Sequence, residues 1–427
     1  MKGRTVVLLT AGVLVLRWIW LAVWCVNFPY ADQWYTDPHI VRAIAGEESL
    51  GLFDFWLGYN NEHRILLHRL MAYAVIAVTG CWDSVAMMYV QAVFAVLPLG
   101  LWLTMLRRTT GFDRLSVVVV VTAFALPLGP ENMLWGFQSQ FYVLVVFAML
   151  LAMAASRRDL RRPSTFVWLM ALAVLGYLNI ACGVFCFAMV ALAYGIDAYR
   201  TRSWRRHLVP IGLAMAAMAW TLLAIPHAFV PDPHKARSIG RFFEHFAKFA
   251  AWPVGVPFVG LALVASLGRR LRTIVVEDPV GRFVLLLAAW IVCSMAMLGY
   301  GRSEVSNRYV DLLLVSVLAL LVLLDAAAPT GRLRKLVSIW KVGVVVAFVG
   351  YFATASLKMV DHMRGSQLER LENARAALDL LPVDPIAAKA RFAKGPLPIE
   401  DVELAWAALL VAQRTGQLPP PLAPSVR

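Results

Sequence analysis

Long apolar runs recur along the whole chain and are separated by short clusters of arginine. An apolar run of about 20 residues matches the ~30 Å thickness of the hydrocarbon core of a bilayer. Only a helix satisfies its own backbone hydrogen bonds at each such crossing, unless the chain closes into a barrel. Of the 427 residues, 60% are hydrophobic and 15% are charged. The sequence therefore predicts an all-α, polytopic membrane helix bundle rather than a soluble domain.

The basic clusters predict the orientation of the chain, because cytoplasmic loops carry an excess of lysine and arginine. We assign six clusters to the cytoplasm, and the N-terminus with them. They are Lys2/Arg4, Arg107-Arg108, Arg157 to Arg162, Arg200 to Arg206, Arg269 to Arg272 and Arg332 to Lys335. Much of the net charge of +14 lies in these clusters. Membrane lipids are thus expected partners, and nucleic acid is not.

This assignment requires about eleven transmembrane helices. The predicted spans are 5–28, 85–106, 115–129, 137–156, 164–178, 182–198, 207–229, 253–268, 281–299, 309–328 and 337–357. The expected location is the plasma (inner) membrane, with multiple passes and a cytoplasmic N-terminus. The outer face then receives the loop that begins at Pro231, the loop from Tyr300 to Arg308 and everything after residue 357.

The sequence divides into a transmembrane domain, 1–357, and a helical C-terminal tail, 358–427, outside the membrane. The first outer loop, 29–84, contains an apolar segment from Arg64 to Gly80 that would invert every later arginine cluster if it crossed. We therefore expect it to form an interfacial helix. The tail shows helical patterns at about 366–381 and 399–415. Between them, Asp384-Pro385 is a typical start of a short helix.

Asp32 directly follows the first span and is flanked by aromatic residues. A carboxylate held at a helix end is suited to act as a general base on an acceptor hydroxyl. The alternative is a solvated carboxylate beside an interfacial aromatic belt.

The segment Asn61-Glu62-His63-Arg64 offers groups that bind a sugar or a phosphate, and Asp37 and His68 lie in the same loop. These histidines and carboxylates are also metal ligands, but no pair of them has a recognised ligand spacing. We therefore predict no metal and no other cofactor, while dependence on a divalent metal stays open. Helix capping and solvation are the alternative roles for these side chains.

Two arginines, Arg302 and Arg308, lie on the outer side, where the charge bias disfavours them. An anionic ligand explains them, because the guanidinium fork matches phosphate oxygens. Pairing with nearby glutamates or with lipid head groups explains them equally well. On the same side, Glu131-Asn132 and Gln138 flank the aromatic Trp135-Gly136-Phe137, which suits carbohydrate or isoprenoid recognition as well as interfacial anchoring.

This arrangement resembles the GT-C superfamily of membrane glycosyltransferases, within it the protein O-mannosyltransferase and aminoarabinose-transferase type. The resemblance covers about 1–357 by layout. Asp32 stands where the family has its catalytic acidic residue, although Gln33 replaces the usual second acidic residue. Ser306-Asn307-Arg308-Tyr309 is similar to the late Ser-Arg-Tyr element near the lipid phosphate.

The resemblance implies a catalytic Asp32 and a set of substrate-binding residues. That set is Asp37, Glu62, His63, Arg64, His68, Glu131, Asn132, Gln138, Arg302, Asn307, Arg308 and Tyr309. It further implies an inverting transfer of sugar from a polyprenyl-phosphate donor to a glycan, lipid or protein acceptor of the cell envelope, at the outer face of the plasma membrane.

Two other functions fit the same pattern. One is a transporter or flippase of an anionic lipid or glycan, and the other is a non-catalytic membrane subunit for envelope assembly. A transporter is expected to place ionisable groups or helix breaks at mid-membrane in related halves. Most charged residues here lie at the ends of the predicted spans, which favours the enzyme.

Overall fold

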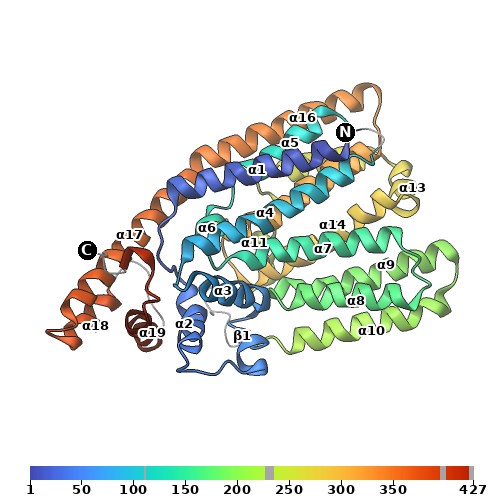
Figure 1. The fold of residues 1–427 in the computed structure, drawn as a ribbon. Coiled ribbons are helices and arrows are strands. Elements are labelled where there is room, and N and C mark those ends of the chain that lie inside the picture. The colour runs from blue at the N-terminus through green and yellow to red at the C-terminus, as the bar shows by residue number, and fades with distance from the viewer. Residues whose placement is uncertain (110–111, 227–234, 395–400, 423–427) are drawn as a thin grey trace.

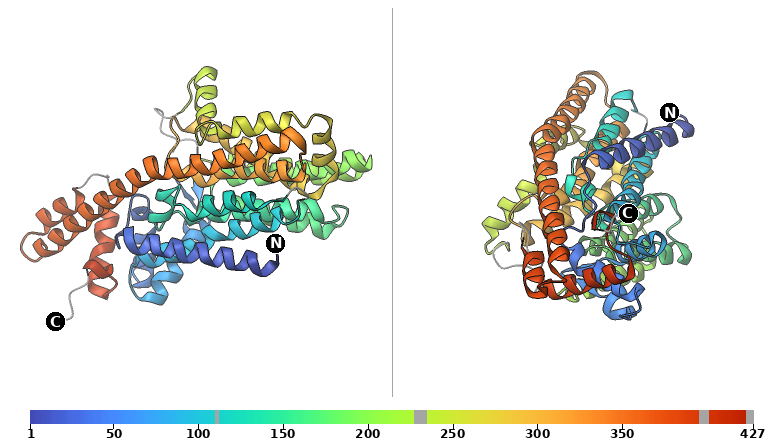
Figure 2. Two further views of the ribbon diagram at one scale, coloured as in Figure 1. Left: turned by 90° about the horizontal axis from the view of Figure 1, so that it is seen from above. Right: turned by 60° about the vertical axis from the view of Figure 1, so that its left-hand side comes forward.

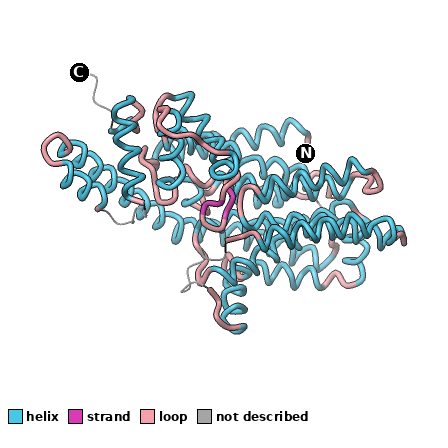
Figure 3. Tube along the Cα trace, turned by 90° about the horizontal axis from the view of Figure 1, so that it is seen from below, coloured by secondary structure: helices cyan, strands magenta, loops and turns pink. Residues whose placement is uncertain are grey.

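The structure is a computed structural model, and it describes residues 1–109, 112–226, 235–394 and 401–422. Long helices run side by side in one bundle, and a smaller group of helices extends from one end of it (Figure 1). Within the described ranges, the only strands are β1 (Tyr59–Asn60) and β2 (His63–Arg64), a short antiparallel pair (Figure 3). The predicted all-α membrane bundle is confirmed.

Eight helices of the described ranges are long and apolar enough to cross a membrane. They are α1 (Gly3–Trp24), α4 (Ser84–Leu106), α7 (Ser139–Arg157), the 3-10 helix η2 (Ala181–Val184) with α9 (Phe185–Thr201), α10 (Trp204–Leu223), α14 (Pro279–Gly301), the 3-10 helix η5 (Asn307–Tyr309) with α15 (Val310–Ala326), and the segment that begins with α16 (Gly331–Tyr351). The protein is therefore a multi-pass membrane protein.

Three of the eleven predicted spans are shorter apolar helices, namely α5 (Arg114–Ala125), α8 (Pro163–Tyr177) and α12 (Val256–Ala265). At 1.5 Å per residue, a helix of this kind covers about half to three quarters of the hydrocarbon thickness. The predicted end of the span at 229 and the start of the following loop at Pro231 lie outside the described residues.

The centre of the bundle is α15, whose sequence is almost entirely leucine, valine and alanine. Of its most apolar window, 83% is buried inside the protein, whereas the figure is 17% for both α1 and α10. A helix that is apolar on all sides belongs in a core, while the apolar outer sides of α1 and α10 are suited to contact lipid.

Residues 29–84, the segment that the sequence predicts as the first outer loop, fold into α2 (Gln33–Ile44), the π-helix η1 (Leu52–Trp56), the β1–β2 hairpin and α3 (Leu66–Thr79). Gly80 ends α3 with φ 69°, a left-handed conformation that glycine adopts without strain. In Figures 1 and 2, α3 runs across the long axis of the bundle instead of along it. This orientation agrees with the interfacial helix expected from 64 to 80.

The C-terminal tail continues from the last span without a break. Helix α16, the π-helix η6 (Phe352–Ser356) and α17 (Leu357–Leu380) form one helical segment that leaves the bundle (Figure 2). It is followed by α18 (Pro385–Ala393), α19 (Val402–Thr415) and the 3-10 helix η7 (Pro420–Leu422). The carboxylate of Asp384 caps α18 by accepting from the backbone N–H groups of residues 386 and 387, as expected. Residues 399–400 of the predicted last helix lie outside the described residues.

The tail packs on the first outer loop and forms a second hydrophobic core with it. Trp34 of α2 makes an edge-to-face contact with Phe392 of α18, at 5.5 Å between ring centroids. Glu47, just after α2, accepts a hydrogen bond of 2.7 Å from Arg414 of α19. The tail thus holds the loop that carries Asp32 against the end of the bundle.

The remaining helices are α6 (Pro130–Leu134), α11 (Ile239–Ala250) and α13 (Arg269–Glu277).

Candidate active site

Arg302 and Glu62 form an ion pair that joins the end of α14 to the hairpin of the first outer loop. The Nε of Arg302 donates to the hydroxyl of Tyr309 at 2.9 Å, and its Nη1 donates to the carbonyl of Gly301 at 3.1 Å. All three nitrogens of this guanidinium therefore have protein partners. Burial alone would lower the pKa of Arg302, but Tyr309 and Glu62 together raise it above its ordinary value, so the side chain stays charged.

His63 lies beside this ion pair, with its Nε2 at 3.6 Å from the carboxylate of Glu62. The backbone N–H of Ala181 donates to Nδ1 at 3.3 Å, so the neutral ring carries its proton on Nε2, toward Glu62. Burial lowers the pKa of His63. Burial would raise the pKa of Glu62, but His63 and Arg302 outweigh it and hold that pKa below its ordinary value. At neutral pH the pair is a neutral imidazole next to a carboxylate.

Arg308 is the second of the two arginines that the sequence predicts on the outer side, and it lies next to Glu131 of α6. Its Nε is 3.6 Å from the Glu131 carboxylate and 3.3 Å from the hydroxyl of Ser306, which itself donates to Glu131 at 3.0 Å. The side chain is 37% exposed. Within the described part of the chain, its terminal Nη1 and Nη2 donate no hydrogen bond. Both terminal nitrogens of Arg308 are therefore available to a ligand, whereas each terminal nitrogen of Arg302 already makes one bond within the protein.

Asp32 immediately precedes α2 and is half-buried. Its carboxylate lies near enough to the guanidinium of Arg308 to stabilise the positive charge. Tyr30, two residues earlier, lies in the same environment. Burial and the charge of Glu131 raise the pKa of Tyr30 to about 12. The structure thus brings Asp32, Glu131 and Arg308 together from three segments that are far apart in the sequence.

Asn132 supports the cluster of Asp32, Glu131 and Arg308 from inside the protein. Its side chain is fully buried, and its Nδ2 donates to the backbone carbonyl of Arg308 and to the carboxylate of Asp311, both at 2.7 Å. Gln91 of α4 donates to the Asn132 carbonyl. Asn132 is therefore placed to position Arg308 and the neighbouring Glu131, and it has no free donor for a substrate.

A buried network of residues that the sequence does not predict as part of the site continues from Asp311 into the bundle. Asp311 is hydrogen-bonded to Tyr142, whose hydroxyl also lies 3.4 Å from a guanidinium nitrogen of Arg17 in α1. The Nε of Arg17 donates to the carbonyl of Phe124 at 2.9 Å. One signal was available in the sequence, because a charged residue inside an apolar span needs a buried partner. These partners fix Arg17 in place.

Asp37, His68 and Gln138 are further predicted site residues that lie inside the protein rather than at this surface. Asp37 is fully buried and accepts hydrogen bonds from Gln33 at 3.0 Å and from Trp82 at 2.9 Å. The Nε2 of His68, also fully buried, lies 3.7 Å from Asp37. Gln138 is 1% exposed and accepts from another buried side chain. In this arrangement Asp37 and His68 connect α2, α3 and the start of α4.

Arg64, in strand β2 of the hairpin, packs against Tyr59 and Tyr177. Its guanidinium lies 4.2 Å from the ring centroid of Tyr59, and its Nε donates to the hydroxyl of Tyr177 at 3.2 Å. The two tyrosine hydroxyls are 2.6 Å apart. Asn307 accepts a hydrogen bond of 2.6 Å from Tyr351, so it anchors the loop that carries Arg308. No group of three or more metal-ligating side chains occurs in the described ranges.

The chain matches no protein-family model, and no curated protein matches it either. Solved structures do match its fold. The oligosaccharyltransferase of Archaeoglobus fulgidus, solved with a tethered acceptor peptide, aligns over 99% of this chain and 65% of its own, with a TM-score of 0.51 and 12% identity.

ArnT from Cupriavidus metallidurans also aligns, in a structure bound to undecaprenyl phosphate and in an apo structure. The bound form covers 98% of this chain and 78% of that one, with a TM-score of 0.47 and 15% identity. The expected similarity is confirmed at the level of the fold, which this chain shares with the oligosaccharyltransferase of Archaeoglobus fulgidus.

Proposed function

We propose that the protein transfers a sugar from a polyprenyl-phosphate donor to a cell-envelope acceptor. One observation carries the proposal: a carboxylate, Asp32, lies near the guanidinium of Arg308, whose terminal nitrogens donate no hydrogen bond to the described residues, at one end of a membrane bundle. Sugar transfer from a lipid phosphate needs this pair of groups, because a proton has to be accepted while negative charge develops on the leaving phosphate.

The reaction follows from these two roles. The oxygen of the acceptor hydroxyl attacks the anomeric carbon of the sugar and gives its proton to Asp32. The bond between that carbon and the phosphate oxygen breaks, and its electron pair leaves with the polyprenyl phosphate. Attack opposite the leaving group inverts the anomeric centre. Arg308 stabilises the departing phosphate with its Nη1 and Nη2 donors.

The neighbouring residues then have supporting roles. Arg302 chiefly positions Glu62 and Tyr309, because each of its three nitrogens already makes a bond within the protein. Glu62 and His63 form a polar edge suited to the hydroxyl groups of the sugar. Since Arg308 supplies the positive charge, the proposal needs no metal, and turnover in the presence of EDTA is expected to be unchanged.

The proposed location is the plasma (inner) membrane, with the site and the C-terminal tail at the outer face. This orientation rests on the arginine clusters, which lie at the other ends of the helices that lead to the site. The proposed acceptor is a glycan, a lipid or a protein of the envelope.

The test uses the donor lipid that a strain lacking the gene should accumulate. Intact-mass analysis of its lipids is expected to show a polyprenyl-phosphate sugar at raised levels. Purified protein in detergent, given that lipid and an envelope fraction, should convert it to free polyprenyl phosphate. A transporter would also cause accumulation, but it would leave the donor intact in detergent, and that result would overturn the proposal.

A further inference from the structure

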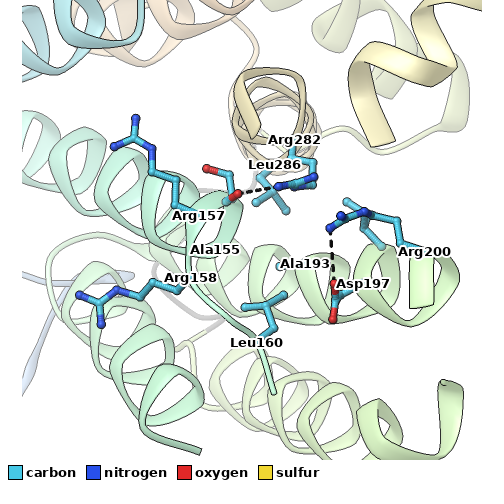
Figure 4. Close-up of a pocket in the computed structure, with 11 residues that line it drawn as sticks. Ala155, Arg157, Arg158, Leu160, Ala193, Asp197, Arg200, Arg282 and Leu286 are labelled. Carbon is cyan, nitrogen blue, oxygen red and sulfur yellow. Dashed lines mark hydrogen bonds and ion pairs between the residues drawn. The ribbon is translucent and has the colours of Figure 1, made fainter. Parts of the chain in front are cut away.

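Two adjoining cavities lie at the end of the bundle away from the candidate active site. Helices α7 and α14 connect the two ends, since α7 begins near Gln138 and ends at Arg157, while α14 begins near the cavities and ends at Gly301. The larger cavity has a volume of about 940 Å³ and lies between the turn from α9 to α10 and helix α13. The smaller cavity measures about 60 Å³ and is shown in Figure 4. Arg200 borders both.

The walls of these cavities carry an excess of positive charge. Six arginines line them, at positions 157, 158, 200, 202, 272 and 282, against two acids, Asp197 and Glu277. Asp197 is already engaged, because His207 lies 3.0 Å and Arg200 3.5 Å from its carboxylate (Figure 4 shows the latter contact). These charges come from four separate helices or turns, so the fold gathers them at one place.

The arginines that line the cavities differ in how many hydrogen bonds they make within the protein. Arg282 is committed to structure, since it donates to the carbonyls of Ser156, Val276 and Glu277 at 2.8–3.2 Å. Arg272 donates to the hydroxyl of Tyr199, itself half exposed. Arg202 is exposed at the C-terminal end of α9, and its side chain has no hydrogen bond or ion pair with any part of the chain that the structure describes. Arg202 and Arg272 thus face the larger cavity with donors to offer.

The larger cavity also adjoins an apolar surface. Helix α10 begins at its rim, where Trp204 is 52% exposed, and continues with exposed Leu208, Val209 and Leu213. Little of α10 is covered by the rest of the bundle. In a membrane this side of α10 contacts acyl chains, and tryptophan and tyrosine at a rim suit the level of the head groups.

We propose that this cavity binds the phosphate-bearing head group of an anionic phospholipid, whose acyl chains lie along α10. The guanidinium groups of Arg202 and Arg272 hold the phosphate oxygens, since the arginine fork matches that geometry. Basic pockets between membrane helices bind anionic head groups in this way. A general attraction of basic loops to the membrane surface would be diffuse, whereas a cavity predicts saturable binding at one site. The proposal does not depend on the glycosyltransferase activity.

The experiment measures lipid binding to the purified full chain by native mass spectrometry. Dioleoyl phosphatidylglycerol is titrated against dioleoyl phosphatidylcholine, which has the same acyl chains and no net charge. We expect one phosphatidylglycerol to bind at least tenfold more tightly than phosphatidylcholine. The double variant Arg202→Gln/Arg272→Gln should lose about 20- to 30-fold of this affinity.

The matched control is Arg205→Gln/Arg206→Gln, which removes the same charge from exposed positions on α10 that do not line the cavity. It should bind like the wild type. The double lysine variant Arg202→Lys/Arg272→Lys, which keeps the charge, should recover part of the lost affinity if the glutamine variant is folded. Equal binding of both lipids, or equal losses in both glutamine variants, would overturn the proposal. Displacement of the lipid by equimolar inorganic phosphate would also overturn it, because the acyl chains would then contribute nothing.

Discussion

Glu62 and Arg302 are ion-paired although 240 residues separate them in the sequence. The pair attaches the hairpin of the first outer loop to the end of α14. Because Arg302 also bonds Tyr309, the same guanidinium fixes the residue that directly follows Arg308. The position of the first outer loop relative to Arg308 therefore depends on this contact.

A double-mutant cycle measures that contact. For Glu62→Gln combined with Arg302→Gln, we expect a coupling of about 1–3 kcal/mol in the free energy of unfolding in mixed detergent micelles. The exposed pair Glu244 and Lys248, 2.8 Å apart on α11, is the control and should give no more than about 0.5 kcal/mol. Equal coupling in the two pairs would show that the Glu62 contact is no more than a surface ion pair.

The buried imidazole of His63 makes stability depend on pH. The pKa of His63 in the folded protein lies below its ordinary value of 6.5, so below about pH 6.5 the unfolded chain binds more protons. The contribution of the neutral His63 to stability is therefore fully present above that pH and is lost as the pH falls. The lowered pKa of Glu62 acts in the same direction, but only below its ordinary value of 4.5.

Thermal unfolding at pH 7.5 and pH 5.5 checks this dependence. The midpoint should fall on acidification in the wild type and fall less in His63→Gln. His362→Gln is the control, because His362 is exposed on α17 and its replacement should leave the dependence unchanged. The same pH dependence in His63→Gln as in the wild type would rule out His63 as its source.

Arg308→Lys tests recognition of the donor phosphate. Lysine keeps the charge but not the planar fork, so the KM for the lipid donor should rise about tenfold. Arg241→Lys, at an exposed position of α11, is the matched control and should leave the KM unchanged. An unchanged KM in Arg308→Lys would show that the phosphate is bound elsewhere.

Asn132→Leu tests the support beneath Arg308. Leucine has the same branching and the same number of side-chain heavy atoms, but it removes the amide N–H groups that bond the Arg308 carbonyl and the Asp311 carboxylate. We expect a loss of about 2–3 kcal/mol in the free energy of unfolding, together with lower turnover. If the unfolding free energy stays within about 0.5 kcal/mol of the wild type, the amide does not hold this loop.

Much of the fold follows from local sequence patterns. The apolar runs and arginine clusters predict the long helices, and Asp384-Pro385 predicts the start of α18, because span length and capping depend on consecutive residues. The end of α3 at Gly80 is of the same kind. These features need no knowledge of distant contacts.

The packing of the site could not be predicted in the same way. Asp32 and Asp37 lie within five residues and have the same side chain, yet Asp32 lies near Arg308 while Asp37 is buried against Trp82. The two residues differ in their positions relative to α2, and the packing of α2 on α3, α4 and the tail decides which of these positions is buried. Arg17 was missed for a related reason, since its partners Tyr142 and Phe124 come from other helices.

The central claim is that Asp32 accepts the proton of the acceptor in a lipid-linked sugar transfer, and one complementation experiment tests it most directly. A strain lacking the gene receives the wild type, Asp32→Asn or Asp54→Asn, with equal expression and thermal stability verified, and its lipids are analysed by intact mass. Asp54 is an exposed carboxylate of the same loop. Loss of a general base costs about 10²–10⁴-fold in rate. The account predicts that Asp54→Asn clears the accumulated polyprenyl-phosphate sugar as the wild type does, whereas Asp32→Asn leaves it at the level of the empty strain. Clearance by Asp32→Asn at the wild-type rate would contradict it.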